Sequence, residues 1–226
     1  MHAIRPYRLF SALTATGSER LAASPIPSRR GFGGTTLLEA FLLVTSCKLV
    51  DARRLFEFGT FMGSTTLVLA LNSADDARIF TFDLASAPPA QQHEADAPLT
   101  QMHLAAKDAL DFMGMPVAHK ITILNGDSLT YDFSSLHGQM DWIFVDGGHD
   151  LACVKADTEN AFRMIDASQS ACIAWHDYKN PDADYSDLTR YLDELSQRET
   201  IIHVEDTKLC FWFSDQRILA NLLGSE

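Results

Sequence analysis

Two groups of acidic and histidine residues follow apolar segments and are the strongest candidates for chemistry. Asp146 and His149 come after the apolar run 142–145, and His176 and Asp177 come after the apolar run 171–175. If the two runs are parallel strands joined by a helix, both aspartates lie at the same edge of the sheet. Converging carboxylates raise each other's pKa unless a cation compensates, so we expect Asp146, Asp177 and His176 to hold a divalent metal ion. The alternative is that one aspartate caps the next helix and the other faces solvent.

His149 is predicted to be a general base. Gly147 and Gly148 give the backbone freedom to turn the imidazole into a cleft, and a histidine can take a proton near neutral pH. Burial would lower its pKa and nearby Asp150 and Asp177 would raise it, so the sign of the shift is left open. His176 is the competing candidate for the same role.

A glycine-rich stretch follows the apolar run 55–58. Gly59 allows a sharp turn, and Gly63 and Ser64 open a helix whose free N–H groups can face a ligand. The spacing is G-x-x-x-G and not G-x-G-x-x-G, so the dinucleotide fingerprint is absent. A tight turn without a ligand explains the glycines about as well.

Two further acidic positions follow predicted strands. Asp83 comes 24 residues after Gly59, close to the spacing of about 20 expected for a carboxylate that binds ribose hydroxyls. The alternative for Asp83 is a cap or turn residue. Asp127 and Ser128 follow the next strand and could bind the exocyclic amine of an adenine or form a simple Asx turn.

Strands and helices alternate along most of the chain. We expect strands at 55–58, 78–82, 120–124, 142–145 and 171–175, and helices at 37–49, 65–71, 100–113, 151–164 and 185–195. Residues 200–204 and 209–213 are separated by four residues, too few for a parallel crossover, so they must form an antiparallel hairpin. The expected fold is a doubly wound α/β sheet, mostly parallel, with an antiparallel C-terminal hairpin.

The chain is expected to form one domain over residues 35–226. Residues 1–34 are dense in turn residues towards their end and are predicted to be an irregular arm or a lid over the site. His93, His103, His119 and His137 have no apparent partner and are expected to be ordinary surface or rim residues.

Composition excludes several classes of protein. Of 226 residues, 18 are Lys or Arg and 30 are Asp or Glu, and the net charge of −12 disfavours nucleic acid as a partner. No apolar run approaches the roughly 20 residues of a membrane span, and no secretory signal is visible. The four cysteines are scattered, so we expect neither disulfides nor a zinc site but a cytoplasmic protein.

From about residue 37 to residue 213, the sequence resembles the class I S-adenosylmethionine-dependent methyltransferases. The motifs Asp146–His149 and His176–Tyr178 are similar to those of the small-molecule O-methyltransferases that include macrocin-type enzymes and relatives of cephalosporin hydroxylase. The resemblance implies a Rossmann-like fold whose last strand is reversed.

The same resemblance implies roles for individual residues. S-adenosylmethionine would be bound by the motif that begins at Glu57 and by the strand-end residues: Glu57, Gly59, Thr60, Gly63, Ser64, Asp83, Asp127, Ser128 and Asp146. Mg²⁺ or Mn²⁺ would be bound at Asp146 and Asp177. The predicted reaction is O-methylation of a small-molecule acceptor with a hydroxyl group, with His149 and Asp146 as catalytic residues. His176-Asp177 replaces the Asp-Asn of catechol-type relatives, so the third metal ligand and the acceptor stay open.

Two other functions remain open at this point. One is a Rossmann oxidoreductase that uses NAD(P), which the missing fingerprint and the terminal hairpin disfavour. The other is a non-catalytic module that binds S-adenosylmethionine. The sequence also does not determine whether the protein forms a homo-oligomer.

Overall fold

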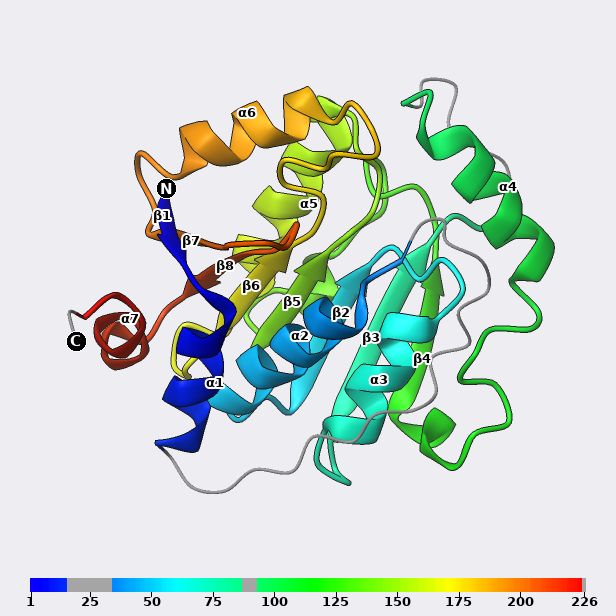
Figure 1. Cartoon of the computed structure of the whole chain (residues 1–226). Helices are drawn as coiled ribbons and strands as arrows, with labels where there is room; N and C mark the ends of the chain where they lie inside the picture. The colour runs from blue at the N-terminus through cyan, green and yellow to red at the C-terminus, as the bar shows by residue number, and fades with distance from the viewer. Residues whose placement is uncertain (16–33, 87–92, 225–226) are drawn as a thin grey trace.

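The computed structural model describes residues 1–15, 34–86 and 93–224. One sheet of eight strands runs through it, in the order β1-β7-β8-β6-β5-β2-β3-β4 (Figure 1). The strands are β1 (His2–Ile4), β2 (Arg54–Phe58), β3 (Arg78–Asp83), β4 (Ile121–Asn125), β5 (Trp142–Val145), β6 (Cys172–Trp175), β7 (Ile201–Val204) and β8 (Cys210–Phe213).

Strand β8 is antiparallel to both of its neighbours, β6 and β7, and the other pairs of the sheet are parallel. The short connection between β7 and β8 forces this reversal, because four or five residues can reverse a chain but cannot carry it back along the sheet. The predicted mostly parallel sheet with an antiparallel hairpin is confirmed.

Helices cover both faces of the sheet. They are α1 (Pro6–Thr14), α2 (Leu37–Leu49), α3 (Ser64–Asn72), α4 (Asp96–Ala106), α5 (Leu151–Met164), α6 (Ser186–Leu195) and α7 (Gln216–Leu223), with short 3₁₀ turns η1 (Pro116–Lys120) and η2 (Ser134–Leu136). One apolar core forms between the sheet and α1, α2, α3 and α7, and a second forms between the sheet and α5 and α6. Successive strand residues alternate between the two cores, as Ile143 and Phe144 do, because side chains of a strand point to opposite faces.

The N-terminal segment differs from the prediction. Residues 1–34 were expected to be irregular, but β1 pairs with β7 and Leu9 of α1 is fully buried in the first core. A strand of three residues carries almost no periodicity, so the sequence pattern does not reveal it. The predicted lid falls on residues 16–33, which lie outside the described residues, and the domain boundary at residue 34 stays a prediction.

Helix α4 is displaced from its predicted position of 100–113. It begins at Asp96, with Pro98 in its first turn where the missing N–H costs nothing, and it ends at Ala106. Helix α7, like β1 and α1, was not predicted. The remaining helices and strands lie within two residues of their expected bounds.

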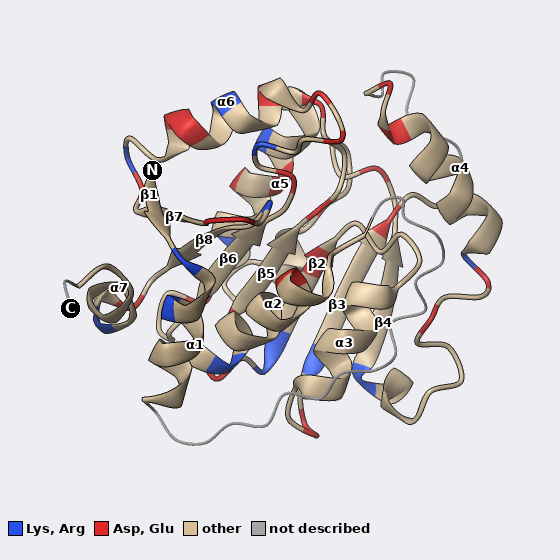
Figure 2. Ribbon diagram, viewed as in Figure 1, with Lys and Arg blue, Asp and Glu red and all other residues tan. Residues whose placement is uncertain are grey.

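The carboxyl ends of the parallel strands meet at one edge, where the loops approach each other closely. Gly59 has a φ of +92°, and a Cβ added there would lie 1.9 Å from the carbonyl oxygen of Asp146. Only glycine fits this contact between the loop after β2 and the loop after β5. Figure 2 shows Asp and Glu residues concentrated along the loops at this edge.

Candidate active site

A cavity of about 640 Å³ lies at the carboxyl edge of the sheet, the usual place for a ligand in an open α/β fold. Eight predicted site residues line it: Gly59, Asp83, Asp127, Ser128, Asp146, His149, His176 and Asp177. Four do not line it: Glu57, Thr60, Gly63 and Ser64. The residues that follow five strands therefore face one cavity, and the other residues of the glycine-rich motif lie outside its lining.

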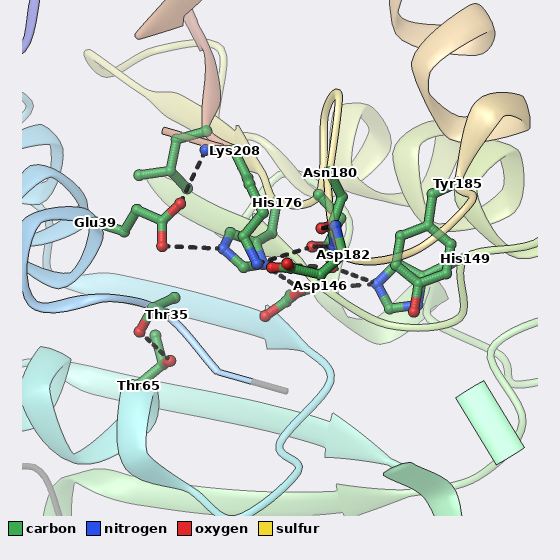
Figure 3. A network of polar contacts seen from close by, with 12 residues as sticks. Thr35, Glu39, Thr65, Asp146, His149, His176, Asn180, Asp182, Tyr185 and Lys208 are labelled. Carbon is green, nitrogen blue, oxygen red and sulfur yellow. Dashed lines mark hydrogen bonds and ion pairs between the residues drawn. The ribbon is translucent and has the colours of Figure 1, made fainter. Parts of the chain in front are cut away.

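Asp146, His149 and Asp177 form a cluster in this cavity, with possible ligand atoms within 4.8 Å of one another. The Nε2 atom of His149 lies 2.7 Å from Oδ2 of Asp177 and 4.0 Å from Oδ1 of Asp146. Asp177 has a φ of +62°, a strained value for a residue with a Cβ, which places its carboxylate among these partners. The two aspartates come together as expected, and Asp150 caps helix α5 instead. Figure 3 shows Asp146 between His176 and His149.

His176 lies on the other side of the two aspartates. Its Nδ1 atom is 3.2 Å from Oδ1 of Asp146 and 3.4 Å from Oδ2 of Asp177, and its Nε2 atom is 3.5 Å from Oε2 of Glu39. Glu39 is 2% exposed, caps helix α2 with Thr36 and accepts a hydrogen bond from the backbone N–H of Lys208. The sequence indicates Glu39 only as a residue in the first turn of a helix, because tertiary structure sets its contacts with residues 176 and 208.

The protein's own cations balance the carboxylates of this cluster. Burial lowers the pKa of His149, but hydrogen bonds and the charges of Asp177 and Asp96 outweigh it and raise the pKa to about 10. Burial opposes a charge on His176 as well, yet the charges of Asp146 and Asp177 raise its pKa well above the ordinary value. The pKa of Asp177 is held well below its usual range against the effect of burial, mainly by the charge of His176.

Glu39 and Lys208 also contribute to the charge balance of the cluster. Burial raises the pKa of Glu39, but the contact with His176 and its charge outweigh it and lower the pKa to about 2. The Lys208 ammonium lies 3.3 Å from Oδ1 of Asp177, whose charge raises the Lys208 pKa against burial. The expected mutual rise of the aspartate pKa values therefore does not occur at Asp177, because two histidines and a lysine compensate.

The donor set of the cluster fits a divalent ion. Two carboxylates and one imidazole nitrogen suit Mn²⁺, Fe²⁺ or Zn²⁺ better than Mg²⁺, which prefers oxygen ligands alone. Binding through His149 would require the loss of its proton, so metal affinity would rise with pH.

Glu57 lies behind the glycine-rich stretch and is 1% exposed. Its Oε2 atom accepts hydrogen bonds from the hydroxyls of Thr66 and Thr81, and Thr81 in turn contacts Thr60 at 2.6 Å. Burial raises the Glu57 pKa to about 8, and the hydrogen bonds oppose the rise. This network ties β2, β3 and α3 together beneath the loop.

Asp83 holds the glycine-rich stretch in place. One carboxylate oxygen accepts a hydrogen bond from the backbone N–H of Phe61, and the other accepts from Leu84. His103 packs beside it, 3.5 Å from the carboxylate and 2.8 Å from the carbonyl oxygen of Phe61. The expectation that His103 is a surface or rim residue without a partner is wrong: it is 5% exposed, and its ring contacts Phe61, Leu84 and Asp83.

The loop after β4 supplies the far end of the cavity. Asp127 accepts a hydrogen bond from the backbone N–H of Leu129, so it forms the Asx turn that was one of the two alternatives. Ser128 lines the cavity beside Asp157 of α5, whose position within a predicted helix gave no sign of a role at the site. Asp157 is 1% exposed with one oxygen lacking a hydrogen-bond partner, and burial raises its pKa to about 7.

A family model described as a methyltransferase domain matches residues 56–178, more than half of the chain and all of the strand ends described above. The chain belongs to this methyltransferase family. The prediction of a class I S-adenosylmethionine-dependent methyltransferase is thereby confirmed, and the sheet order with its single reversed strand agrees with it.

Solved structures with the same fold come from several organisms. A Staphylococcus aureus protein with a provisional caffeoyl-CoA O-methyltransferase assignment is 14% identical, with a TM-score of 0.56 over 92% of this chain and 97% of that one. A methyltransferase from Geobacter sulfurreducens is 15% identical, with a TM-score of 0.53 over 93% and 96%. Podospora anserina PaMTH1, solved with S-adenosylhomocysteine, is 14% identical, with a TM-score of 0.51 over 91% and 86%. At these identities the likeness shows the fold.

A search of curated protein sequences found no match to this chain. Within the described residues, no helix has the length and apolar character needed to cross a membrane.

Proposed function

We propose that this methyltransferase transfers the methyl group of S-adenosylmethionine to a hydroxyl of a small-molecule acceptor, with a divalent metal ion at Asp146 and Asp177. The observation that carries the proposal is the Asp146–His149–Asp177 cluster, which shares one cavity with Asp83 and the glycine-rich stretch. The provisional assignment of the Staphylococcus aureus protein supports oxygen as the methylated atom.

The cofactor half of the proposed site consists of the residues that follow β2, β3 and β4. Gly59 and Phe61, which line the cavity, would contact the methionine part, with Glu57, Thr60 and Gly63 shaping the loop around them. Asp83 would accept hydrogen bonds from the ribose hydroxyls. Ser128, and Asp127 through the carboxylate oxygen that the Asx turn does not use, would bind the adenine.

The acceptor half of the proposed site contains Asp146, His149 and Asp177. Methyl transfer requires an acceptor oxygen about 3 Å from the methyl carbon, in line with the leaving sulfur, and removal of the hydroxyl proton. We assign proton removal to Nε2 of His149, the ring nitrogen that faces both aspartates. In this proposal the carboxylates of Asp146 and Asp177 alone would hold the metal ion, and Nε2 is not a ligand. A divalent ion held by Asp146 and Asp177 would lower the pKa of an acceptor hydroxyl, and His176 would fix these carboxylates from behind.

The protonation of His149 sets a condition on this assignment. With a pKa of about 10 the imidazole carries a proton at neutral pH, and a protonated imidazole cannot act as a base. The charges of Asp177 and Asp96 cause that rise, so neutralising Asp177 would return the His149 pKa towards its ordinary value. A cation that neutralised Asp177 would lower the His149 pKa and favour the unprotonated imidazole that the assignment requires.

Calorimetry with defined ligands tests the cofactor. We expect the purified protein to bind S-adenosylmethionine and S-adenosylhomocysteine but neither NAD nor NADP. At 100-fold its dissociation constant, a ligand adds about 2.7 kcal/mol to the free energy of unfolding, which a thermal melt resolves. Binding of NADP without binding of S-adenosylhomocysteine would restore the oxidoreductase alternative.

Turnover with a panel of phenols, catechols and sugar hydroxyls tests the reaction. We expect formation of S-adenosylhomocysteine, detected by mass spectrometry, to stop with a chelator and to return with Mn²⁺ or Mg²⁺. Full turnover after exhaustive chelation would remove the metal from the proposal. Cofactor binding without turnover on any acceptor would favour the non-catalytic module.

A further inference from the structure

Helix α4 forms one wall of the cavity and is attached in an unusual way. A surface helix normally docks through an apolar stripe, yet the buried side chains of α4 are Asp96 and His103. These residues are seven positions apart, two turns of helix, so they lie on the same face and about 10 Å apart along the axis. Pro98, Leu99 and Thr100 between them line the cavity.

The first anchor joins α4 to His149. The Asp96 carboxylate accepts hydrogen bonds from the His149 backbone N–H at 2.9 Å, the ring Nδ1 at 2.8 Å and the Tyr185 hydroxyl at 3.0 Å. The Tyr185 ring stacks on the imidazole, with centroids 4.1 Å apart and an interplanar angle of 11°. The imidazole is thus held from one edge and from the face that Tyr185 covers (Figure 3), and its Nε2 atom lies 2.7 Å from Oδ2 of Asp177.

The second anchor joins α4 to the proposed cofactor half. The two ring nitrogens of His103 lie 2.8 Å from the carbonyl oxygen of Phe61 and 3.3 Å from that of Leu84. These residues flank the Asp83 carboxylate on either side, because their backbone N–H groups both donate to it. His103 therefore touches the backbone that positions Asp83.

Building on the proposed function, we infer that Asp96 is a positioning residue for His149 and that α4 couples cofactor binding at Asp83 to the orientation of the His149 ring. One short helix carries both anchors, so a ligand that orders the loop around Phe61 and Asp83 also favours the docked helix and the Asp96–His149 contact. Coupling of this kind is reciprocal. If cofactor binding favours the Asp96–His149 contact by a given factor, loss of that contact must weaken cofactor binding by the same factor. When α4 is docked, Asp96 holds Nδ1 of His149, so Nε2 is the ring nitrogen left to face the cluster.

Crossed measurements on two variants test the coupling. Asp96→Ala removes the anchor at His149 and His103→Ala removes the anchor at Asp83, while Gln101→Ala on the exposed face of α4 is the control. The readouts are calorimetry with S-adenosylhomocysteine and nitrogen NMR of the His149 ring, assigned with a His149→Gln variant. Circular dichroism and thermal melts confirm that each variant folds.

We expect both Asp96→Ala and His103→Ala to change both readouts, the cofactor affinity and the His149 ring signals. Asp96→Ala should weaken S-adenosylhomocysteine binding at least about fivefold, although the residue lies outside the proposed cofactor half. His103→Ala should shift the His149 ring signals, although the two side chains belong to different halves of the site. Gln101→Ala should change neither readout.

The outcomes separate this inference from the proposed function. If Asp96→Ala changes only the His149 ring signals and His103→Ala changes only the S-adenosylhomocysteine affinity, the coupling is wrong. If Asp96→Ala leaves the His149 ring signals unchanged, the positioning role is wrong. If the wild-type protein binds no S-adenosylhomocysteine, the proposed function fails. The His149 signals of the His103→Ala variant then still decide whether α4 connects the two ends.

Discussion

Replacing Glu57 with glutamine tests the structure beneath the glycine-rich stretch. The carboxyl group is buried, one oxygen accepts from Thr66 and Thr81, and the other oxygen has no hydrogen-bond partner. Burial is the main cause that raises its pKa from 4.5 to about 8, and the charges of Asp146 and Asp83 add to it. Folded protein therefore holds a proton on Glu57 at neutral pH that unfolded protein releases.

The sign and size of the effect follow from linkage. A carboxyl group whose pKa is higher in the folded state stabilises the unfolded state increasingly as the pH rises from 4.5 to 8. Each pKa unit corresponds to 1.36 kcal/mol, so Glu57 lowers the free energy of unfolding by roughly 3 kcal/mol at pH 7 and by about 5 kcal/mol well above pH 8. Glutamine has no proton to release and should abolish this share of the pH dependence.

Urea unfolding without ligand at pH 5, 6, 7 and 8, followed by tryptophan fluorescence, measures the effect. We expect the free energy of unfolding of wild-type protein to fall more steeply than that of Glu57→Gln, by up to about 1.4 kcal/mol per pH unit. Asp157 and His149 titrate in both proteins, so the difference between the profiles isolates Glu57. Parallel profiles would refute a proton held on Glu57 in the folded state.

The same variant addresses cofactor contact. Because Glu57 does not line the cavity, Glu57→Gln should bind S-adenosylhomocysteine within about twofold of wild type. A tenfold loss would instead place the carboxylate in direct contact with the cofactor, as the resemblance to methyltransferases implies.

Three further predictions concern the cavity itself. Asp83→Ala should weaken S-adenosylhomocysteine binding by about 1–3 kcal/mol in calorimetry, because a charge-assisted hydrogen-bond acceptor is lost; equal affinity would rule out the ribose role. Gly59→Ala should unfold at far lower urea than Gly138→Ala, since both have positive φ but only the first meets a backbone atom, the Asp146 carbonyl oxygen. His149→Ala should lower kcat by about 10²–10⁴, and an unchanged kcat would transfer the base to another residue.

The sequence predicts the sheet and the edge at which ligands bind. Buried strands such as 142–145 are continuous apolar runs, and polar residues directly after them must lie at the carboxyl edge. The convergence of Asp146 and Asp177 follows from these strand ends alone. The reversal of β8 is equally predictable, because the length of a connection restricts the topology.

The residues that escaped prediction are polar and buried through tertiary contacts. Asp96 and His103 lie on a helix with little apolar periodicity, and Glu39 reaches its partners from the opposite end of the sequence. Nothing in the local pattern distinguishes such residues from a solvated helix face, because their burial depends on partners in other elements. The sign of the His149 pKa shift stays open in the sequence for the same reason: the second carboxylate, Asp96, comes from a distant helix.

The pairing of β1 with β7 has a consequence for the order in which the protein folds. About two hundred residues separate His2–Ile4 from Ile201–Val204, so closing this loop costs more chain entropy than pairing the neighbouring central strands. During synthesis β1 must wait until β7 leaves the ribosome before it can pair. We therefore expect the edge of the sheet at β1 to form last and to open first in native-state hydrogen exchange, while the strands that carry the candidate site are already protected.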